Sequence, residues 1–305
     1  MSPLKRIIIT DKKHGLPFSK GLLAKSITAA GISPKLAYHI AELVENHLRK
    51  QGLLTVTSAQ LKQVILEILV THAGDEKTEK YKKWQVLGAL DKPLIILIGG
   101  TTGVGKSTIA SEMAHRLAIN RIVSSDSVRE VMRAVFSKEI SPTLHESSFS
   151  AWRAIRTPVD EKVDPVIVGF MEQVAVVSVG IEAIIQRAIN ENIHMMIEGI
   201  HVVPGFLDLK IFKDAFVVPL IVAVEDEKSH KGHFYVRGVQ THQQRPFEKY
   251  VENFDTIRKI GFYIEELARK HKAAIIESYN LDSTISTAME EVYKQVQSLM
   301  SPINN

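Results

Sequence analysis

The feature that most constrains this chain is the stretch at residues 94–108, LIILIGGTTGVGKST. A run of apolar residues leads into a glycine-rich turn, and the segment after the turn repeats apolar residues every four positions. This order predicts a buried strand, a tight loop and a helix. From Gly100 onward the loop reads Gly-x-x-x-x-Gly-Lys-Ser, which is the complete Walker A pattern of phosphate-binding loops.

Each residue type in this loop suits phosphate binding. Glycines let successive backbone N–H groups converge on phosphate oxygens, and the helix that follows adds the positive end of its dipole. Lys106 would supply a mobile positive charge, and the Ser107 hydroxyl would complete the ligand shell of a Mg²⁺ ion. We therefore predict ATP and Mg²⁺ as cofactors. The residues predicted to bind ATP are Gly100, Thr101, Thr102, Gly103, Val104, Gly105, Lys106, Ser107 and Thr108.

Composition narrows the class of protein. The 305 residues are 45% hydrophobic and 24% charged, which suits about two globular domains. A net charge of +4 without long basic runs does not indicate nucleic-acid binding. The absence of cysteine excludes disulfides and thiolate metal sites, and it suits a cytoplasmic protein. The apolar stretch at residues 166–189 is interrupted by charges, so we expect a buried helix there and no association with a membrane.

The first 74 residues form a self-contained pattern. A short strand at 6–10 and a polar turn at 11–15 precede three segments with helical periodicity and cap signals. A charged, partly amphipathic connector at 75–91 then leads to the phosphate-loop strand. We predict a small domain with its connector over residues 1–90 and a larger domain over 91–305.

This first unit resembles an ATP-cone, a small regulatory nucleotide-binding module found at the front of some nucleotide-dependent enzymes. The resemblance rests on DKKHGLPFSKGLLAKSITAAGISPKLAYHIAELVENHL followed by LLTVTSAQLKQVILEIL, with the usual Arg-Asp-Gly turn replaced by DKKHG. It implies a nucleotide effector site. The alternative is a structural or dimerising module; in the dimerising case the protein would be a homo-oligomer.

The larger unit alternates strand and helix signals, which predicts an α/β fold with a parallel sheet. Asp126 follows a strand predicted at 121–124, where ligands approach an open α/β sheet. Asp126 could orient or deprotonate an acceptor hydroxyl, and Arg129 could grip an anionic group with its guanidinium fork. Arg133, one turn further, is a third substrate-binding candidate or a solvated surface charge.

A simpler interpretation of the same segment is a helix start. Ser127 and Glu130 have the spacing of a capping box, in which a serine and a glutamate satisfy the first N–H groups of a helix. The functional interpretation of Asp126 and Arg129 is favoured because they follow a phosphate-binding loop.

A second acidic residue ends a later apolar strand. Residues 194–201 read HMMIEGIH, and Glu198 stands at the strand tip as in a Walker B pattern, where a carboxylate holds Mg²⁺ or its waters. We predict Ser107 and Glu198 as the metal-binding pair. His201 could contact the acceptor, although a lone histidine is more often structural.

Residues 225–250 are the most polar stretch of the larger unit and hold three histidines. Their spacing matches no metal-binding motif, so we interpret the stretch as a mobile lid. Arginines brought in by lid closure would stabilise the negative charge of a phosphoryl transition state. Arg237 and Arg245 are therefore predicted to be catalytic, together with Lys106 and Asp126; surface arginines are the alternative.

Taken together, GGTTGVGKST, SSDSVREVMR, IEGIHVVPG and the segment from HFYVR to YVENFDTIRKI resemble the 2-phosphoglycerate kinases. The resemblance implies a P-loop kinase fold with a parallel sheet flanked by helices, preceded by a mainly helical ATP-cone domain. It implies transfer of the γ-phosphoryl group of ATP to the hydroxyl of 2-phosphoglycerate, a small phosphorylated acid. The product would be 2,3-bisphosphoglycerate, a precursor of the cyclic bisphosphoglycerate of some methanogens. His233 stands where we would expect arginine in this family.

Two other functions stay open from the residues. A zeta-toxin-like kinase, or another small-molecule P-loop kinase, would share the Asp-x-x-Arg pattern and the lid. A non-catalytic ATP-binding switch would need Lys106 and Ser107 but no acceptor base, so Asp126 discriminates the two classes.

Overall fold

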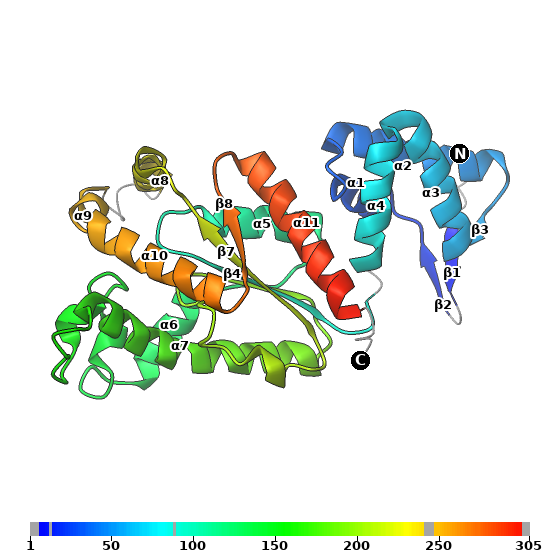
Figure 1. The fold of residues 1–305 in the computed structure, drawn as a ribbon. Helices are drawn as coiled ribbons and strands as arrows, with labels where there is room; N and C mark the ends of the chain where they lie inside the picture. The colour runs from blue at the N-terminus through cyan, green and yellow to red at the C-terminus, as the bar shows by residue number, and fades with distance from the viewer. Residues whose placement is uncertain (1–5, 12–13, 88–89, 241–246, 301–305) are drawn as a thin grey trace. The chain divides into compact units, whose positions relative to one another are not determined.

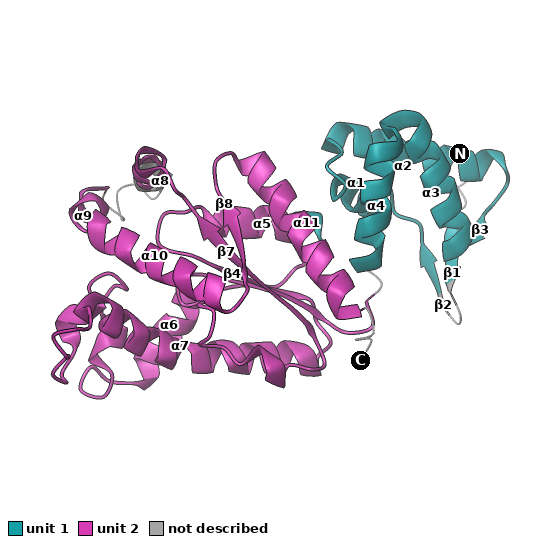
Figure 2. Ribbon diagram, in the orientation of Figure 1, with its two compact units in different colours: residues 1–89, 115–118 teal, residues 90–114, 119–305 magenta. Residues whose placement is uncertain are grey.

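The computed structural model describes residues 6–11, 14–87, 90–240 and 247–300. The chain divides into two compact units, residues 1–89 with 115–118 and residues 90–114 with 119–305 (Figure 2).

In the part of the first unit that the structure describes, a three-stranded sheet is combined with four helices. Strand β1 pairs antiparallel with β2 and parallel with β3. The predicted turn at 11–15 is only partly right, because His14 already begins β2. Fully buried residues from three helices, Ile27, Ile40 and Leu69, contribute to its core. The elements are β1 (Ile8–Asp11), β2 (His14–Pro17), α1 (Lys20–Thr28), α2 (Pro34–Lys50), β3 (Thr55–Thr57), α3 (Ser58–Ala73) and α4 (Asp75–Leu87).

The second unit is built on a five-stranded sheet in the order β5-β6-β4-β7-β8, with every neighbouring pair parallel. All six residues of the central strand β4 are buried, as its unbroken apolar sequence predicts. Because the strands are parallel, their carboxyl ends meet at one edge of the sheet, where the phosphate loop begins. The strands are β4 (Leu94–Gly99), β5 (Ile122–Ser124), β6 (Met195–Glu198), β7 (Phe216–Ala223) and β8 (Ala274–Glu277).

Helices cover both faces of this sheet, and α7 and α11 lie on opposite sides of it (Figure 1). The predicted α/β fold, a parallel sheet flanked by helices, is confirmed. The helices are α5 (Lys106–Arg116), α6 (Ser125–Val135), α7 (Pro165–Asn190), α8 (Glu227–Gln240), α9 (Phe247–Glu252), α10 (Phe254–Lys270) and α11 (Leu281–Met300), with short 3-10 turns η1 (Pro142–His145), η2 (Ala151–Ala154) and η3 (Leu209–Ile211).

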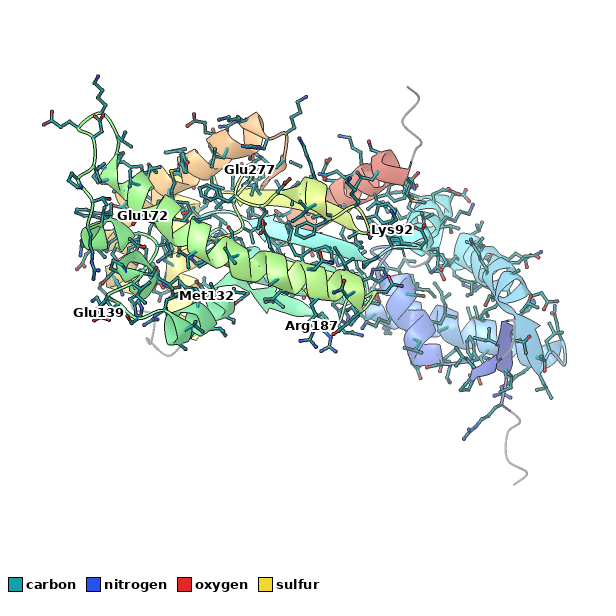
Figure 3. The ribbon with its side chains drawn as sticks, turned by 90° about the horizontal axis from the view of Figure 1, so that it is seen from below. Lys92, Met132, Glu139, Glu172, Arg187 and Glu277 are labelled. Carbon is teal, nitrogen blue, oxygen red and sulfur yellow. The ribbon has the colours of Figure 1, made fainter. Side chains whose placement is uncertain are left out.

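Helix α7 is the long apolar helix that the sequence predicts. Among the residues that the structure describes, it alone is long and apolar enough to span a membrane. Its inner face nevertheless packs into the protein: Ile181 joins a cluster with strands β4 and β6, and Phe170 joins a second cluster with α10. Met132 of α6 lies beside α7 (Figure 3). We therefore interpret α7 as a core helix.

This interpretation predicts a difference between two apolar residues on α7. Ile181 is fully buried, whereas Val179 is 62% exposed. Ile181→Ala should lower the free energy of unfolding by about 2–5 kcal/mol, because it leaves a cavity in the core. Val179→Ala should change it by about 0.5 kcal/mol or less. Urea unfolding followed by circular dichroism measures both; equal losses would contradict the packing described.

Candidate functional site

The phosphate-binding loop joins β4 to α5, as the sequence predicts. Gly103 has φ +88°, in the left-handed region that favours glycine. A Cβ at this position would also collide with the Phe234 ring of α8. Gly103 is therefore required both by the backbone conformation and by the helix packed against the loop.

Two later helices, α8 and α10, form hydrogen bonds with this loop. His230 Nε2 donates to Thr102 O at 2.7 Å, and His233 Nδ1 donates to Gly103 O at 2.9 Å. Thr101 Oγ1 donates to Ile257 O of α10 at 2.9 Å. A peptide group is planar and trans, so a carbonyl held on one side turns the next N–H toward the other side. The contacts made by α8 therefore orient loop N–H groups away from α8.

These histidine contacts are not predicted from the sequence. Its pattern over residues 225–250 favours a mobile lid, whereas residues 227–240 form helix α8, and His230 and His233 contact loop carbonyls. The described residues contain no group of three His, Cys, Asp or Glu that could hold a metal ion. The spacing of His230 and His233, three residues apart on one helix face, was the only signal available.

Lys106 points back into its own loop. Its Nζ donates to Thr101 O at 2.6 Å, and the residue is 8% exposed. Burial lowers the pKa of Lys106, while the Glu198 and Asp126 carboxylates act in the opposite direction. The charges predicted for nucleotide, metal and acceptor therefore lie close enough to act on one another.

Ser107 and Glu198 meet directly. Ser107 Oγ donates to Glu198 Oε1 at 3.0 Å across 91 positions of sequence. Glu198 ends β6 and is 8% exposed. A hydroxyl and a carboxylate in contact are hard oxygen donors, the kind of ligand that Mg²⁺ takes, usually with several waters and substrate phosphates. This pair fits the metal site that the sequence predicts.

Asp126 follows the carboxyl end of β5, as the sequence predicts, and lies in the first turn of α6. The predicted capping box is wrong: Ser124 is the N-cap, and its Oγ accepts from Ser127 N at 3.0 Å. The strand passes into the helix without an intervening loop, which shifts the cap three residues toward the N-terminus. Asp126 still reaches the same sheet edge, and its side chain is 52% exposed.

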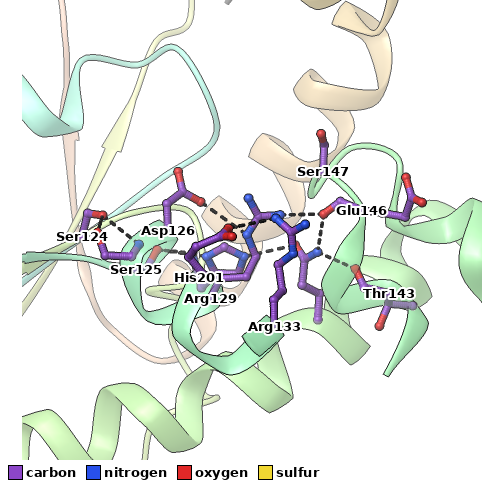
Figure 4. Close-up of polar contacts among 12 residues, drawn as sticks. Ser124, Ser125, Asp126, Arg129, Arg133, Thr143, Glu146, Ser147 and His201 are labelled. Atoms are coloured by element: carbon purple, nitrogen blue, oxygen red, sulfur yellow. Dashed lines mark hydrogen bonds and ion pairs between the residues drawn. The ribbon is translucent and has the colours of Figure 1, made fainter. Parts of the chain in front are cut away.

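Arg129 lies one turn after Asp126, and the two side chains face each other (Figure 4). Arg129 Nε is 3.8 Å from Asp126 Oδ1, and Arg129 Nη1 donates to Glu146 O at 2.6 Å. Arg133 instead pairs with Glu130, at 2.9 Å. The structure thus brings Asp126 and Arg129 together, while the guanidinium of Arg133 is engaged by its own helix.

The remaining predicted positions are a histidine and two arginines. His201 is fully buried and bonds to Ser125 and Gln173, so it does not face a substrate. Arg237 belongs to α8, but its side chain lies outside the described residues. Arg245 lies wholly outside them.

Burial of His230 predicts a pH dependence of stability. Burial lowers its pKa from 6.5 to about 4. Between these values the unfolded chain binds a proton that the folded chain does not, so stability is lost as pH falls from 6.5 toward 4. His230→Gln retains an N–H donor for Thr102 O but does not titrate. The wild type should therefore lose on the order of 3 kcal/mol relative to this variant across that window.

Urea unfolding of both proteins at pH 7.5, 6, 5 and 4.5 measures this difference. His201, whose pKa is also lowered by burial, is present in both chains and cancels in the comparison. Parallel pH profiles would show that His230 is not buried in its neutral form.

No protein-family model matches the chain. Among solved structures, TT1252 from Thermus thermophilus covers 69% of this chain and all of its own at 17% identity, with a TM-score of 0.40, which is too low to bear on function.

Curated relatives are far more similar. The 2-phosphoglycerate kinase of Methanothermobacter thermautotrophicus is 41% identical over 94% of this chain and 93% of its own. That of Methanopyrus kandleri is 40% identical over 92% and 85%, and that of Thermococcus kodakarensis 41% over 96% and 99%. Identity at this level over nearly whole chains means that the chain belongs to the 2-phosphoglycerate kinase family, whose members are phosphotransferases with an alcohol group as acceptor.

Proposed function

We propose that this protein transfers the γ-phosphoryl group of ATP to the hydroxyl of 2-phosphoglycerate, giving 2,3-bisphosphoglycerate and ADP. The observation that carries the proposal is the 3.0 Å contact between Ser107 Oγ and Glu198 Oε1, which joins the phosphate loop to a strand-tip carboxylate. The names of the relatives support the choice of acceptor.

The phosphate loop and the residues next to it would bind the nucleotide. The loop N–H groups and Lys106 would bind the β and γ phosphates. Ser107 and Glu198 would hold Mg²⁺, which neutralises charge on the phosphates. On nucleotide binding, Lys106 Nζ would exchange its contact with Thr101 O for phosphate oxygens, which offsets the desolvation that lowers its pKa.

Residues of helix α6 would bind and activate the acceptor. Asp126 would accept the proton of the attacking hydroxyl, and its exposed carboxylate can be reached by a substrate. Arg129 would bind the carboxylate or phosphate of the acceptor. We further propose that Arg237 and Arg245 approach the transferred phosphoryl group from the lid. Arg133 would assist in binding the acceptor. The reaction would take place in the cytoplasm.

The first prediction concerns the acceptor. Purified protein with Mg·ATP should release ADP when 2-phosphoglycerate is added, but not with 3-phosphoglycerate, UDP-N-acetylglucosamine or no acceptor. Lys106→Ala should abolish the release, because the phosphates lose their main cation. Release with the nucleotide sugar alone would favour a zeta-toxin-like kinase. ATP binding without release for any acceptor would favour the non-catalytic switch.

Asp126 provides the second prediction. Asp126→Asn retains size and polarity but removes the proton acceptor, so transfer should slow by about 10²–10⁴-fold. ATP affinity, measured by equilibrium binding, should stay unchanged. Asp214→Asn is the matched control, since Asp214 is an exposed acid just before β7 begins, at the other edge of the sheet. Unchanged turnover in Asp126→Asn would remove this residue from the mechanism.

A further inference from the structure

Beneath the proposed acceptor site runs a chain of hydrogen bonds through three fully buried side chains. Ser125 Oγ lies 3.0 Å from His201 Nδ1, and His201 Nε2 lies 3.1 Å from Gln173 Oε1. Ser125, His201 and Gln173 are each 0% exposed. Gln173 Nε2 then donates to two carbonyls, Thr143 O at 2.7 Å and Glu146 O at 3.0 Å.

The chemistry of these groups determines where each proton lies. Carbonyl oxygens only accept, so the Gln173 amide nitrogen must face Thr143 and Glu146 and its oxygen must face His201. His201 therefore carries its proton on Nε2 and donates it to Gln173. His201 Nδ1 is then an acceptor, and the Ser125 hydroxyl donates to it. Burial lowers the pKa of His201 to about 3, which agrees with a neutral ring bearing a single proton.

The two ends of this chain lead to the two acceptor residues. Ser125 directly precedes Asp126 in the first turn of α6. At the other end, Glu146 O accepts from both Gln173 Nε2 and Arg129 Nη1 (Figure 4). Gln173 itself belongs to α7, the core helix. The network therefore links the start of α6 and the segment around Glu146 to a rigid element.

We propose that His201 and Gln173 are positioning residues that hold Asp126 and Arg129 in register for the acceptor. The proposal rests on the proposed function, which gives those two residues to 2-phosphoglycerate. Side chains that face a charged substrate are held in place by packing and by hydrogen bonds made beneath them. A small loss of alignment lowers the efficiency of transfer without affecting the nucleotide loop.

Two variants break the network at different points. Ser125→Ala removes the donor to His201 Nδ1, and Gln173→Leu removes the group that joins His201 to both carbonyls. Ser178→Ala is the matched control: Ser178 is also a buried serine, on α7, with no hydrogen-bond partner for its hydroxyl among the described residues.

The KM for 2-phosphoglycerate should rise roughly tenfold in Ser125→Ala and at least as much in Gln173→Leu. The KM for ATP should stay within about twofold, since the nucleotide loop is untouched.

The ring nitrogens of His201 provide a second measurement, which does not depend on turnover. In protein labelled with ¹⁵N-histidine, and with the His201 signals assigned through His201→Asn, the wild type should show the proton on Nε2. A proton on Nδ1 would overturn the network as drawn. Ser125→Ala should shift the Nδ1 resonance, because that nitrogen loses its donor, and Ser178→Ala should not.

The kinetic outcomes separate this inference from the proposed function. Equal increases in the KM for ATP and for the acceptor, with a lowered melting temperature, would show that the network only stabilises the fold. An unchanged acceptor KM in both variants would overturn the positioning role while the kinase activity stands. Wild-type protein without 2-phosphoglycerate-dependent ADP release would refute the proposed function, and the positioning of that acceptor with it, even if the proton is found on Nε2.

Discussion

The parallel pairing of β4 with β6 is the constraint on which the candidate site depends. Its register sets Ile98 opposite Glu198, so that Glu198 ends its strand beside the start of the phosphate loop. The pairing of β5 with β6 sets Ser124 opposite the same glutamate. A slip of one residue would turn each side chain to the opposite face of the sheet and separate Ser107 from Glu198. The alignment of three strands thus brings Ser107, Glu198 and Asp126 to one edge.

Hydrogen bonds with neighbouring helices, as well as the loop's own glycines, determine the conformation of the phosphate loop. A glycine-rich loop has many accessible conformations, and its N–H groups converge on an anion only when the backbone is held in one of them. Here α8 and α10 hold three consecutive residues of the loop, from Thr101 to Gly103. The stretch interpreted from sequence as a lid therefore contains a helix that supports the phosphate loop, and Arg237, one of the two proposed lid arginines, belongs to that helix.

Six polar residues at and beneath the candidate site form two sets with different surroundings. Lys106, Glu198 and Asp126 are ionisable groups that act on one another's charges at the sheet edge. Ser125, His201 and Gln173 are neutral and buried, and each is paired with a donor or acceptor of the opposite kind. Buried neutral groups with every hydrogen bond satisfied rigidify a core at little cost in free energy. Charged groups at the edge of the sheet would instead be stabilised by an ion of opposite charge.

Local patterns in the sequence determined the phosphate loop, the core helix and the alternation that makes the sheet parallel, because each depends on residues adjacent in the chain. The prediction that Glu198 is a Walker B carboxylate came from its own strand together with the Walker A loop earlier in the chain. Only the tertiary structure decided the cap at Ser124, the contacts of His230 and His233, and the network through His201. These depend on groups many positions apart that meet only once the sheet is assembled, and a single sequence carries no signal for such distances. The ATP-cone resemblance of the first unit stays a prediction, since a resemblance in sequence does not identify a ligand.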